Sequence, residues 1–353
     1  MSDVRLIAFY LPQFHPIPEN DAWWGEGFTE WTNVRRAKPN FVGHYQPHVP
    51  TELGYYDLRD PGTREAQANL ARAHGIHGFC YYYYWFGDKR LLDLPLDEVV
   101  RSGRPDFPFC VSWANGNWTR RWDGGNDELL MAQTYSSESE RRLIAELLPV
   151  FRDRRYIRVN GRPLLLVHRA DLLPDPRSTT GVFRDAALAS GEAEPYLAMV
   201  HVPGIATPAA LGFDAGIEFP PHGLEIATLT EDIERLNPNF VGEVWDYVSA
   251  AKYAMGRPLP EFPLFRSVMV GWDNTPRLQN NGHIFVNAHP ENYRRWLAAM
   301  IAETRQTRSE GERIVFVNAW NEWAEGCYLE PGERFGRGFL EATRAALADD
   351  PRL

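Results

Sequence analysis

Short apolar runs rich in β-branched and aromatic residues recur along the chain, and few of them alternate with polar residues. Near-continuous apolar runs are typical of strands that are buried on both faces, as in parallel sheets. The pattern predicts eight such strands, at residues 5–13, 77–85, 108–116, 163–169, 196–202, 215–220, 265–273 and 313–321.

Helical patterns separate several of these runs. Residues 291–303 repeat apolar side chains at the i, i+3, i+4 spacing of a helix with one buried face. Ser137 and Glu140 have the spacing of a capping box at the start of another pattern. Helices are predicted at 62–75, 137–151, 291–303 and 336–349. Alternating strands and helices predict an α/β fold, and eight strands predict a (β/α)8 TIM barrel with long βα loops.

Two connections are unusually long, and both follow predicted strands. They span residues 14–62 and 203–264. Long structured loops are more often functional than accidental, and the loops after barrel strands line the active face. No low-complexity linker or change in composition divides the chain, so one domain is expected over residues 1–353.

Polar and aromatic residues gather where the predicted strands end. One such residue alone is more simply explained as a packed or hydrogen-bonded side chain, but all eight ends carry them. Because barrel active sites lie at the C-terminal ends of strands, we expect one site for a polyhydroxylated ligand. Trp31 and two other tryptophans of the first long connection are expected to be stacking platforms, and Asn321 is expected to orient Glu322. The candidate substrate-binding residues are Tyr10, His15, Trp23, Trp24, Tyr84, Trp85, Trp113, Asn115, His168, His201, Glu218, Trp272, Trp320 and Asn321.

Glu322 and Glu325 stand three positions apart in "NAWNEWAEG", directly after the last apolar run. A carboxylate is costly to bury without a partner, so the pair is either a structural cluster or a chemical site. A helix-like turn would bring both to one side, and Gly326 allows a further sharp turn. Two carboxylates in one cavity repel each other, which can raise the pKa of one of them. The protonated carboxyl then serves as a proton donor and the ionised one as a base or nucleophile, as glycoside hydrolysis requires. In the structural alternative, Glu322 forms a salt bridge with an arginine and Glu325 caps a helix.

Composition narrows the classes of partner. The formal net charge of -10 argues against a nucleic-acid or anionic-membrane partner, which favours a basic face. The sequence has no apolar run long enough for a membrane span and no signal-peptide pattern at its start, so a cytoplasmic location is expected. The three cysteines are expected to be reduced thiols. The 12 tryptophans fit either an aromatic core or a sugar site.

Other chemistries find less support in the sequence. It contains no glycine-rich phosphate loop, no GxSxG elbow and no zinc signature, and no metal or cofactor is predicted. A divalent metal held by Asp273, Glu218 and the two glutamates is the alternative. The sequence carries no signal for a particular oligomeric state.

Several segments resemble known families. "NEWAEGCYLEP" (321–331) resembles the N-E-W-x-E-G-x-x-x-E-P segment of glycoside hydrolase family 99, the endo-α-mannosidase family. Residues 9–58, "GFCYYYYWF" (78–86) and "FCVSWANGNWTRRWDG" (109–124) look like segments of the WbsX family, and this resemblance spans nearly the whole chain. WbsX proteins are related to family 99 and are often encoded with bacterial surface-polysaccharide genes.

The resemblance to family 99 implies a fold and a mechanism. Its members are (β/α)8 barrels and retaining hydrolases, with two glutamates at the places of Glu322 and Glu325. By this resemblance, Glu322 is the base for the sugar 2-hydroxyl, which attacks the anomeric carbon and gives a 1,2-anhydro sugar. Glu325 protonates the leaving oxygen and then activates water. The scheme needs an α-manno or α-rhamno configuration, and Ala324 stands where the endomannosidases usually carry histidine.

The predicted function is a retaining glycoside hydrolase that acts on α-linked residues of a bacterial polysaccharide or oligosaccharide. WbsX proteins are often labelled glycosyltransferases, so a transferase or transglycosidase in surface-polysaccharide (O-antigen) biosynthesis is one alternative. A sugar-nucleotide transferase usually has a doubly wound nucleotide domain, which the sequence does not show. A non-catalytic glycan-binding barrel is the second alternative, and it would keep its ligand without the two glutamates.

Overall fold

The computed structural model describes residues 3–120 and 128–349. Eight parallel strands form a closed ring in the order β1-β15-β12-β10-β9-β8-β4-β2, and pairing of β1 with β2 completes it. Each strand corresponds to one of the eight predicted runs, so the (β/α)8 barrel is confirmed. The strands are β1 (Arg5–Tyr10), β2 (Ile76–Phe86), β4 (Phe109–Trp113), β8 (Arg162–Val167), β9 (Tyr196–Val200), β10 (Ala215–Ile217), β12 (Leu264–Met269) and β15 (Ile314–Asn318).

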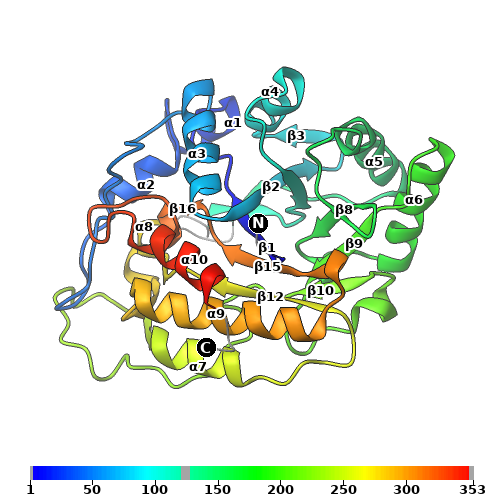
Figure 1. Ribbon diagram of the computed structural model, residues 1–353. Helices are drawn as coiled ribbons and strands as arrows, with labels where there is room; N and C mark the ends of the chain where they lie inside the picture. Colours follow the sequence, from blue (N-terminus) through cyan, green and yellow to red (C-terminus); the bar gives the residue numbers. More distant parts are fainter. Residues whose placement is uncertain (1–2, 121–127, 350–353) are drawn as a thin grey trace.

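Seven α-helices of the described chain follow successive barrel strands and cover the outside of the ring. Figure 1 shows the last two, α9 and α10, side by side in orange and red. Between β9 and β10 the described connection contains a 3-10 turn, η3 (Pro208–Leu211), in place of an α-helix. The seven helices are α3 (Pro61–Ala73), α4 (Leu94–Ser102), α5 (Ser137–Phe151), α6 (Pro176–Ala189), α7 (Tyr247–Gly256), α9 (Pro290–Thr307) and α10 (Gly338–Ala348). Among the described helices, none is both long and apolar enough to cross a membrane.

The start of α5 differs from the predicted capping box. The N-cap is Ser136, whose hydroxyl accepts a hydrogen bond from the backbone N–H of Ser139 at 3.1 Å. Ser137 is therefore the first helical residue and not the cap. Glu140 is buried and accepts a hydrogen bond from the hydroxyl of Thr179 on α6 at 2.7 Å. The Glu140 carboxylate, which the pattern had assigned to the cap, therefore contacts the next helix instead.

The two long connections contain structure of their own. The first holds α1 (Pro18–Trp24) and α2 (Glu30–Arg36), and the second holds β11 (Glu243–Asp246). Strand β11 pairs with β14 of the following connection, and β14 pairs with β13, which forms a small three-stranded sheet. The other short elements are β3 (Lys89–Leu91), β5 (Trp118–Thr119), β6 (Leu129–Met131), β7 (Arg158–Val159), η2 (Ala170–Leu172), β13 (Trp272–Asp273), α8 (Thr275–Leu278), η4 (Gln279–Asn281), β14 (His283–Val286), η5 (Glu310–Glu312), β16 (Asn321–Glu322), η6 (Trp323–Glu325) and β17 (Cys327–Tyr328).

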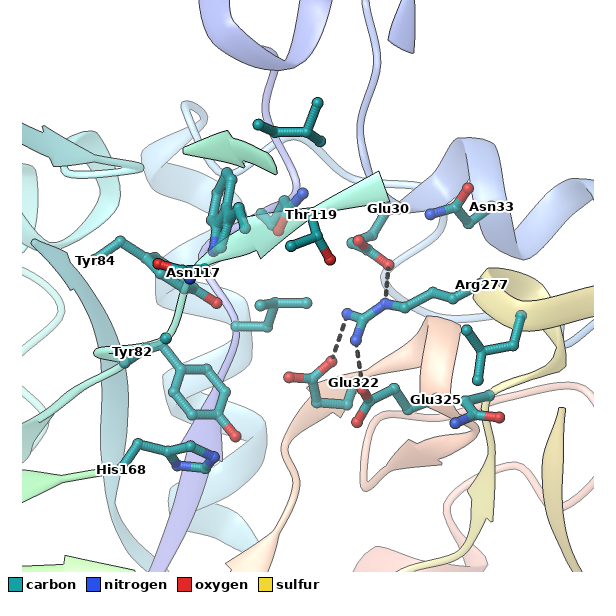
Figure 2. Close-up of a pocket in the computed structure, with 18 of the residues that line it drawn as sticks. Glu30, Asn33, Tyr82, Tyr84, Asn117, Thr119, His168, Arg277, Glu322 and Glu325 are labelled. Atoms are coloured by element: carbon teal, nitrogen blue, oxygen red, sulfur yellow. Dashed lines mark hydrogen bonds and ion pairs between the residues drawn. The ribbon is translucent and has the colours of Figure 1, made fainter. Parts of the chain in front are cut away.

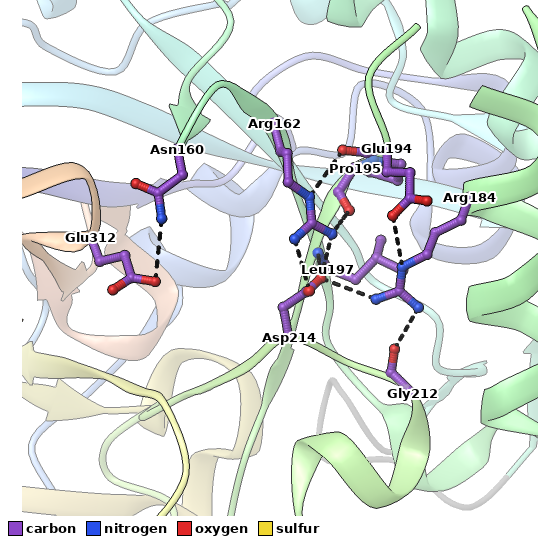
Figure 3. A network of polar contacts seen from close by, with 9 residues as sticks. All are labelled: Asn160, Arg162, Arg184, Glu194, Pro195, Leu197, Gly212, Asp214 and Glu312. Atoms are coloured by element: carbon purple, nitrogen blue, oxygen red, sulfur yellow. Dashed lines mark hydrogen bonds and ion pairs between the residues drawn. The ribbon is translucent and has the colours of Figure 1, made fainter. Parts of the chain in front are cut away.

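The N-terminal ends of neighbouring strands are joined by a polar network around Asp214, just before β10 (Figure 3). Its carboxylate accepts hydrogen bonds from Arg162 on β8 at 2.9 and 3.0 Å and from Arg184 on α6 at 3.1 Å. It also accepts one from the backbone N–H of Leu197 on β9 at 2.8 Å. The network lies at the barrel end opposite the expected active face, where such contacts serve stability.

Candidate active site

A cavity of about 610 Å³ lies at the C-terminal ends of the barrel strands. Its walls include residues of β2, α1, α2 and α8 and of the turn after β15, so both barrel strands and long connections build it. The position is that of barrel active sites, and the volume lies in the range of small-ligand sites.

The chain after β15 bends so that both glutamates face this cavity. The short strand β16 ends at Glu322, and the 3-10 turn η6 follows and ends at Glu325. The turn closes at Gly326, which has a φ of +59°. A Cβ atom there would come within 2.9 Å of the Cβ of Asp273, so both the backbone angle and the available space require glycine. The bend predicted from the spacing is confirmed.

Arg277 of α8 lies between three carboxylates, two of them those of Glu322 and Glu325 (Figure 2). Its Nη2 donates a hydrogen bond to Glu322 at 3.1 Å, its Nε donates to Glu30 of α2 at 3.1 Å, and its Nη1 contacts Glu325. The side chain of Glu325 is the most exposed of the four, at 16%. The salt bridge considered as an alternative for Glu322 is therefore present, while Glu325 bonds to the same arginine and caps no described helix.

One guanidinium does not balance three carboxylates. Burial raises the pKa of Glu322 well above its ordinary value, repulsion from Glu325 adds to this rise, and Arg277 opposes it. Burial also raises the pKa of Glu325, again against the effect of Arg277. The pair therefore tends to hold one proton at a pH where exposed glutamates are both ionised. A shared proton beside an ionised carboxylate is the state from which general acid–base chemistry begins.

Neutral hydrogen-bonding groups form the wall that faces this cluster in Figure 2. Strand β2 presents Tyr82 and Tyr84, which share one face because strand residues alternate. Burial and the nearby carboxylates raise the pKa of both phenols. His168 lies beside Tyr82, and burial lowers its pKa to about 3. Its Nδ1 is buried and has no hydrogen-bond partner among the described residues.

A buried polar network supports the turn from behind. Glu330 accepts hydrogen bonds from Trp323 Nε1 and Gln67 Nε2, both at 2.7 Å, and from the Tyr56 hydroxyl at 2.9 Å. Burial raises the pKa of Glu330 to about 7 against these donors. Asn321 bonds to the backbone N–H and carbonyl of Leu11 at 2.8 and 3.0 Å. The Asn321 amide thus fixes the backbone that carries Glu322. These contacts support the prediction that Asn321 orients Glu322, which stays a proposal.

The structure brings six of the predicted site residues to the cavity and places ten outside its described lining. Alternation along the strands explains part of this result, because Trp85 and Trp113 point away from the cavity. The indole Nε1 of Trp113 donates a hydrogen bond to the backbone carbonyl of Trp85. The six are Trp24, Tyr84, His168, Trp272, Glu322 and Glu325. The ten are Tyr10, His15, Trp23, Trp85, Trp113, Asn115, His201, Glu218, Trp320 and Asn321.

Two acidic residues considered as metal ligands have other partners. Glu218 accepts a hydrogen bond from Arg266 at 2.7 Å and also contacts Arg257. Asp273 lies 2.7 Å from His44 Nε2 and accepts a hydrogen bond of 2.7 Å from Gln46. In residues 3–120 and 128–349, no group of three or more His, Cys, Asp or Glu side chains is arranged to hold a metal ion.

The sequence analysis missed Arg277 and Glu30, which complete the carboxylate cluster. Glu30 lies on a short helix of the first long connection and Arg277 on a short helix after β12, and neither follows a predicted strand directly. No spacing in the sequence relates them to Glu322. Tyr82 and His222 also line the cavity without having been singled out. Residues 121–124 of the "FCVSWANGNWTRRWDG" segment lie outside the described residues.

The fold and the cavity define a class, a (β/α)8 barrel with a buried carboxylate pair after its last strand. The chain belongs to the WbsX family, because the family model described as "Glycosyltransferase WbsX" matches residues 6–343. The uncharacterized protein WxcX of Xanthomonas campestris pv. campestris strain B100 is 45% identical over 346 residues, which are 98% of this chain and 50% of that protein. The chain therefore spans about half the length of the curated relatives it matches.

Solved structures show the same fold. The GH99 endo-alpha-mannosidase from Bacteroides thetaiotaomicron superposes with a TM-score of 0.61 at 15% identity, over 99% of this chain and 97% of that one. A structure described as a glycoside hydrolase-like protein also has a TM-score of 0.61, at 14% identity, over 98% and 94% of the two chains. At these identities the likeness establishes the barrel architecture.

We expect Gly326→Ala to lower the free energy of unfolding by about 2 kcal/mol or more, because alanine disfavours positive φ and its Cβ would crowd Asp273. Urea unfolding measures the difference. Gly181→Ala, inside α6 and with nothing within 4 Å of the added Cβ, is the control. It should be neutral or stabilise by up to about 1 kcal/mol. Equal effects of the two substitutions would contradict a constrained turn.

The raised pKa of Glu330 makes stability depend on pH. The folded protein retains a proton that the unfolded chain releases, so the free energy of unfolding falls as pH rises from 4.5 to about 7. The full shift corresponds to about 3 kcal/mol. We expect Glu330→Gln to remove this part of the slope in chemical unfolding between pH 4.5 and 8. The raised pKa values of Glu322 and Glu325 contribute to the slope in wild type and in Glu330→Gln alike. Identical slopes for the two proteins would therefore show that Glu330 does not titrate in this pH range.

Proposed function

We propose that this chain is a retaining glycoside hydrolase that cleaves α-linked manno- or rhamno-configured residues of a bacterial polysaccharide or oligosaccharide. The buried pair of Glu322 and Glu325, joined through Arg277 in the strand-end cavity, is the observation that carries the proposal. The fold shared with an endo-alpha-mannosidase supports the same chemistry.

In the first step, the Glu322 carboxylate takes the proton of the sugar 2-hydroxyl, and O2 forms a bond to C1. The bond from C1 to the glycosidic oxygen breaks, and the Glu325 carboxyl gives its proton to that oxygen. Substrate binding decides which carboxyl carries the shared proton. The 2-hydroxyl donates to Glu322 and stabilises its ionised form, whereas the glycosidic oxygen accepts only from a protonated Glu325.

In the second step, water opens the 1,2-anhydro sugar. The Glu325 carboxylate takes a proton from water, the water oxygen bonds to C1, and the C1–O2 bond breaks. Glu322 returns its proton to O2, which restores both carboxyls to their starting states. Each step inverts C1, so the product retains the configuration of the substrate. Arg277 contacts both carboxylates and offsets part of their charge while the protons move.

A glycosyltransferase is the second candidate, and the description of the family itself favours it. A transferase moves a sugar from an activated donor to an acceptor, so its reaction depends on an added nucleotide sugar. A hydrolase releases sugar in water without one. Ala324 is buried and lies outside the described cavity lining, so this position gives no side chain to select mannose over rhamnose. Both sugars therefore belong among the substrates tested.

We expect wild-type protein to release sugar from a panel of α-mannosyl, α-rhamnosyl and surface-polysaccharide substrates. Glu325→Gln and Glu322→Gln should each lower the rate by about 10³-fold, because each removes a proton-transfer group. Glu341→Gln, on the exposed face of α10, is the control and should retain full activity. Release that survives both cavity substitutions would overturn the mechanism. Product formed only with added nucleotide sugars would favour the transferase.

Arg277 should set the pH range of activity. Its positive charge lowers the pKa of both catalytic glutamates, so Arg277→Met should raise both values. Both limbs of the profile of kcat/KM against pH should then move to higher pH, because the base ionises later and the acid keeps its proton longer. Arg277→Lys keeps the charge and should stay closer to wild type. Unmoved limbs in Arg277→Met would show that the arginine does not control these protons.

A further inference from the structure

Asn20 of α1 lines the cavity with an amide that has no partner. The residue is 0% exposed, and neither Oδ1 nor Nδ2 makes a hydrogen bond within the part of the chain that the structure describes. Buried polar groups of native proteins are nearly always paired, and an unpaired amide costs stability. Because Asn20 lines the cavity, its unpaired amide is suited to a partner that enters the cavity.

Asn33 of α2 repeats this feature on the same wall. It is 3% exposed, it lines the same cavity, and its Oδ1 also lacks a partner among the described residues. Figure 2 shows Asn33 beside Glu30, on the opposite side of the view from Tyr82 and His168. The first long connection thus contributes two asparagines with unpaired atoms to the cavity lining, and Asn33 lies beside the carboxylate cluster.

The two helices are held in place by contacts that do not involve these amides. The carboxylate of Asp21 accepts a hydrogen bond from the backbone N–H of Gly27 at 2.9 Å, which ties α1 to the loop before α2. Trp31 Nε1 donates to the carbonyl of Tyr56 at 2.8 Å, which ties α2 to the end of the same connection. Neither of these contacts involves the side chain of Asn20 or Asn33.

We infer that Asn20 and Asn33 form a hydroxyl-binding subsite for a neutral sugar residue adjacent to the scissile bond. An amide combines an acceptor oxygen with two N–H donors, so it pairs with an alcohol in either direction. The half-buried Trp24 lines the same cavity and offers an aromatic surface for the C–H face of a sugar. The surplus negative charge around Arg277 disfavours an acidic sugar there. The sugar class rests on the proposed function, but binding at the subsite does not require the reaction.

The test uses Asn20→Leu, which keeps the approximate size of the side chain and removes its hydrogen bonds. Isothermal titration calorimetry in a Glu325→Gln background measures binding of α-1,2-mannobiose, α-1,3-mannobiose and α-1,3-rhamnobiose without turnover. We expect affinity to fall at least tenfold, while the melting temperature of the ligand-free protein is unchanged or rises. Asn33→Leu should act in the same direction. It also tests the subsite if Asn20→Leu does not fold.

Asn115→Leu is the matched control, because Asn115 is also 0% exposed but its amide is fully engaged with Arg169 and Tyr135. Its loss should lower the melting temperature clearly. An equal loss of stability in Asn20→Leu would identify a structural residue and overturn the inference. Unchanged affinity, or no binding of any probe to the Glu325→Gln parent, would also overturn it. If the Asn20→Leu substitution weakens binding but the wild-type protein releases no sugar, the proposed hydrolase activity is overturned and the proposed subsite is retained.

Discussion

The single guanidinium of Arg277 among three carboxylates is the interaction on which the cavity depends. Glu30 comes from the connection after β1, Arg277 from the connection after β12 and Glu322 from the turn after β15, so the cluster joins distant parts of the chain. A purely structural buried cluster is most stable when its charges cancel. Among the described residues of this cluster, two negative charges are in excess when all groups are ionised, and burial makes it favourable for the pair of glutamates to retain a proton.

The rest of the fold makes this unfavourable arrangement possible. Barrel closure sets β1 beside β15, and Asn321 bonds across that pair to the backbone of Leu11. Glu330 holds Trp323 of the turn through a hydrogen bond to the indole. These contacts fix the backbone on both sides of Glu322 with side chains that have their partners already. The backbone that carries the carboxylates is thus held by neutral and paired groups, and the carboxylates themselves bond to Arg277.

The sequence predicted more of the scaffold than of the cavity. Eight apolar runs became eight strands because burial on both faces leaves a clear signal in a parallel barrel. The pair of Glu322 and Glu325 was found because its members lie within one turn. Arg277 was not found, since its relation to them exists only after the barrel closes. The choice of Tyr84 with Trp85 shows another limit, because an apolar run does not reveal which alternate residues face the cavity.

Polar residues around the cavity fall into two groups, according to whether their side-chain atoms have hydrogen-bond partners among the described residues. Asn115 and Asn321 use their amides on the backbone of neighbouring strand ends, and removing either would leave protein groups unpaired. Asn20 and His168 line the cavity and have buried atoms without a hydrogen-bond partner among the described residues. The first group therefore contributes to stability and the second reduces it. Burial alone does not separate the two groups, because Asn20 and Asn115 are equally buried. The hydrogen-bond partners of each amide make that distinction, and they are the basis on which we propose a ligand contact at Asn20.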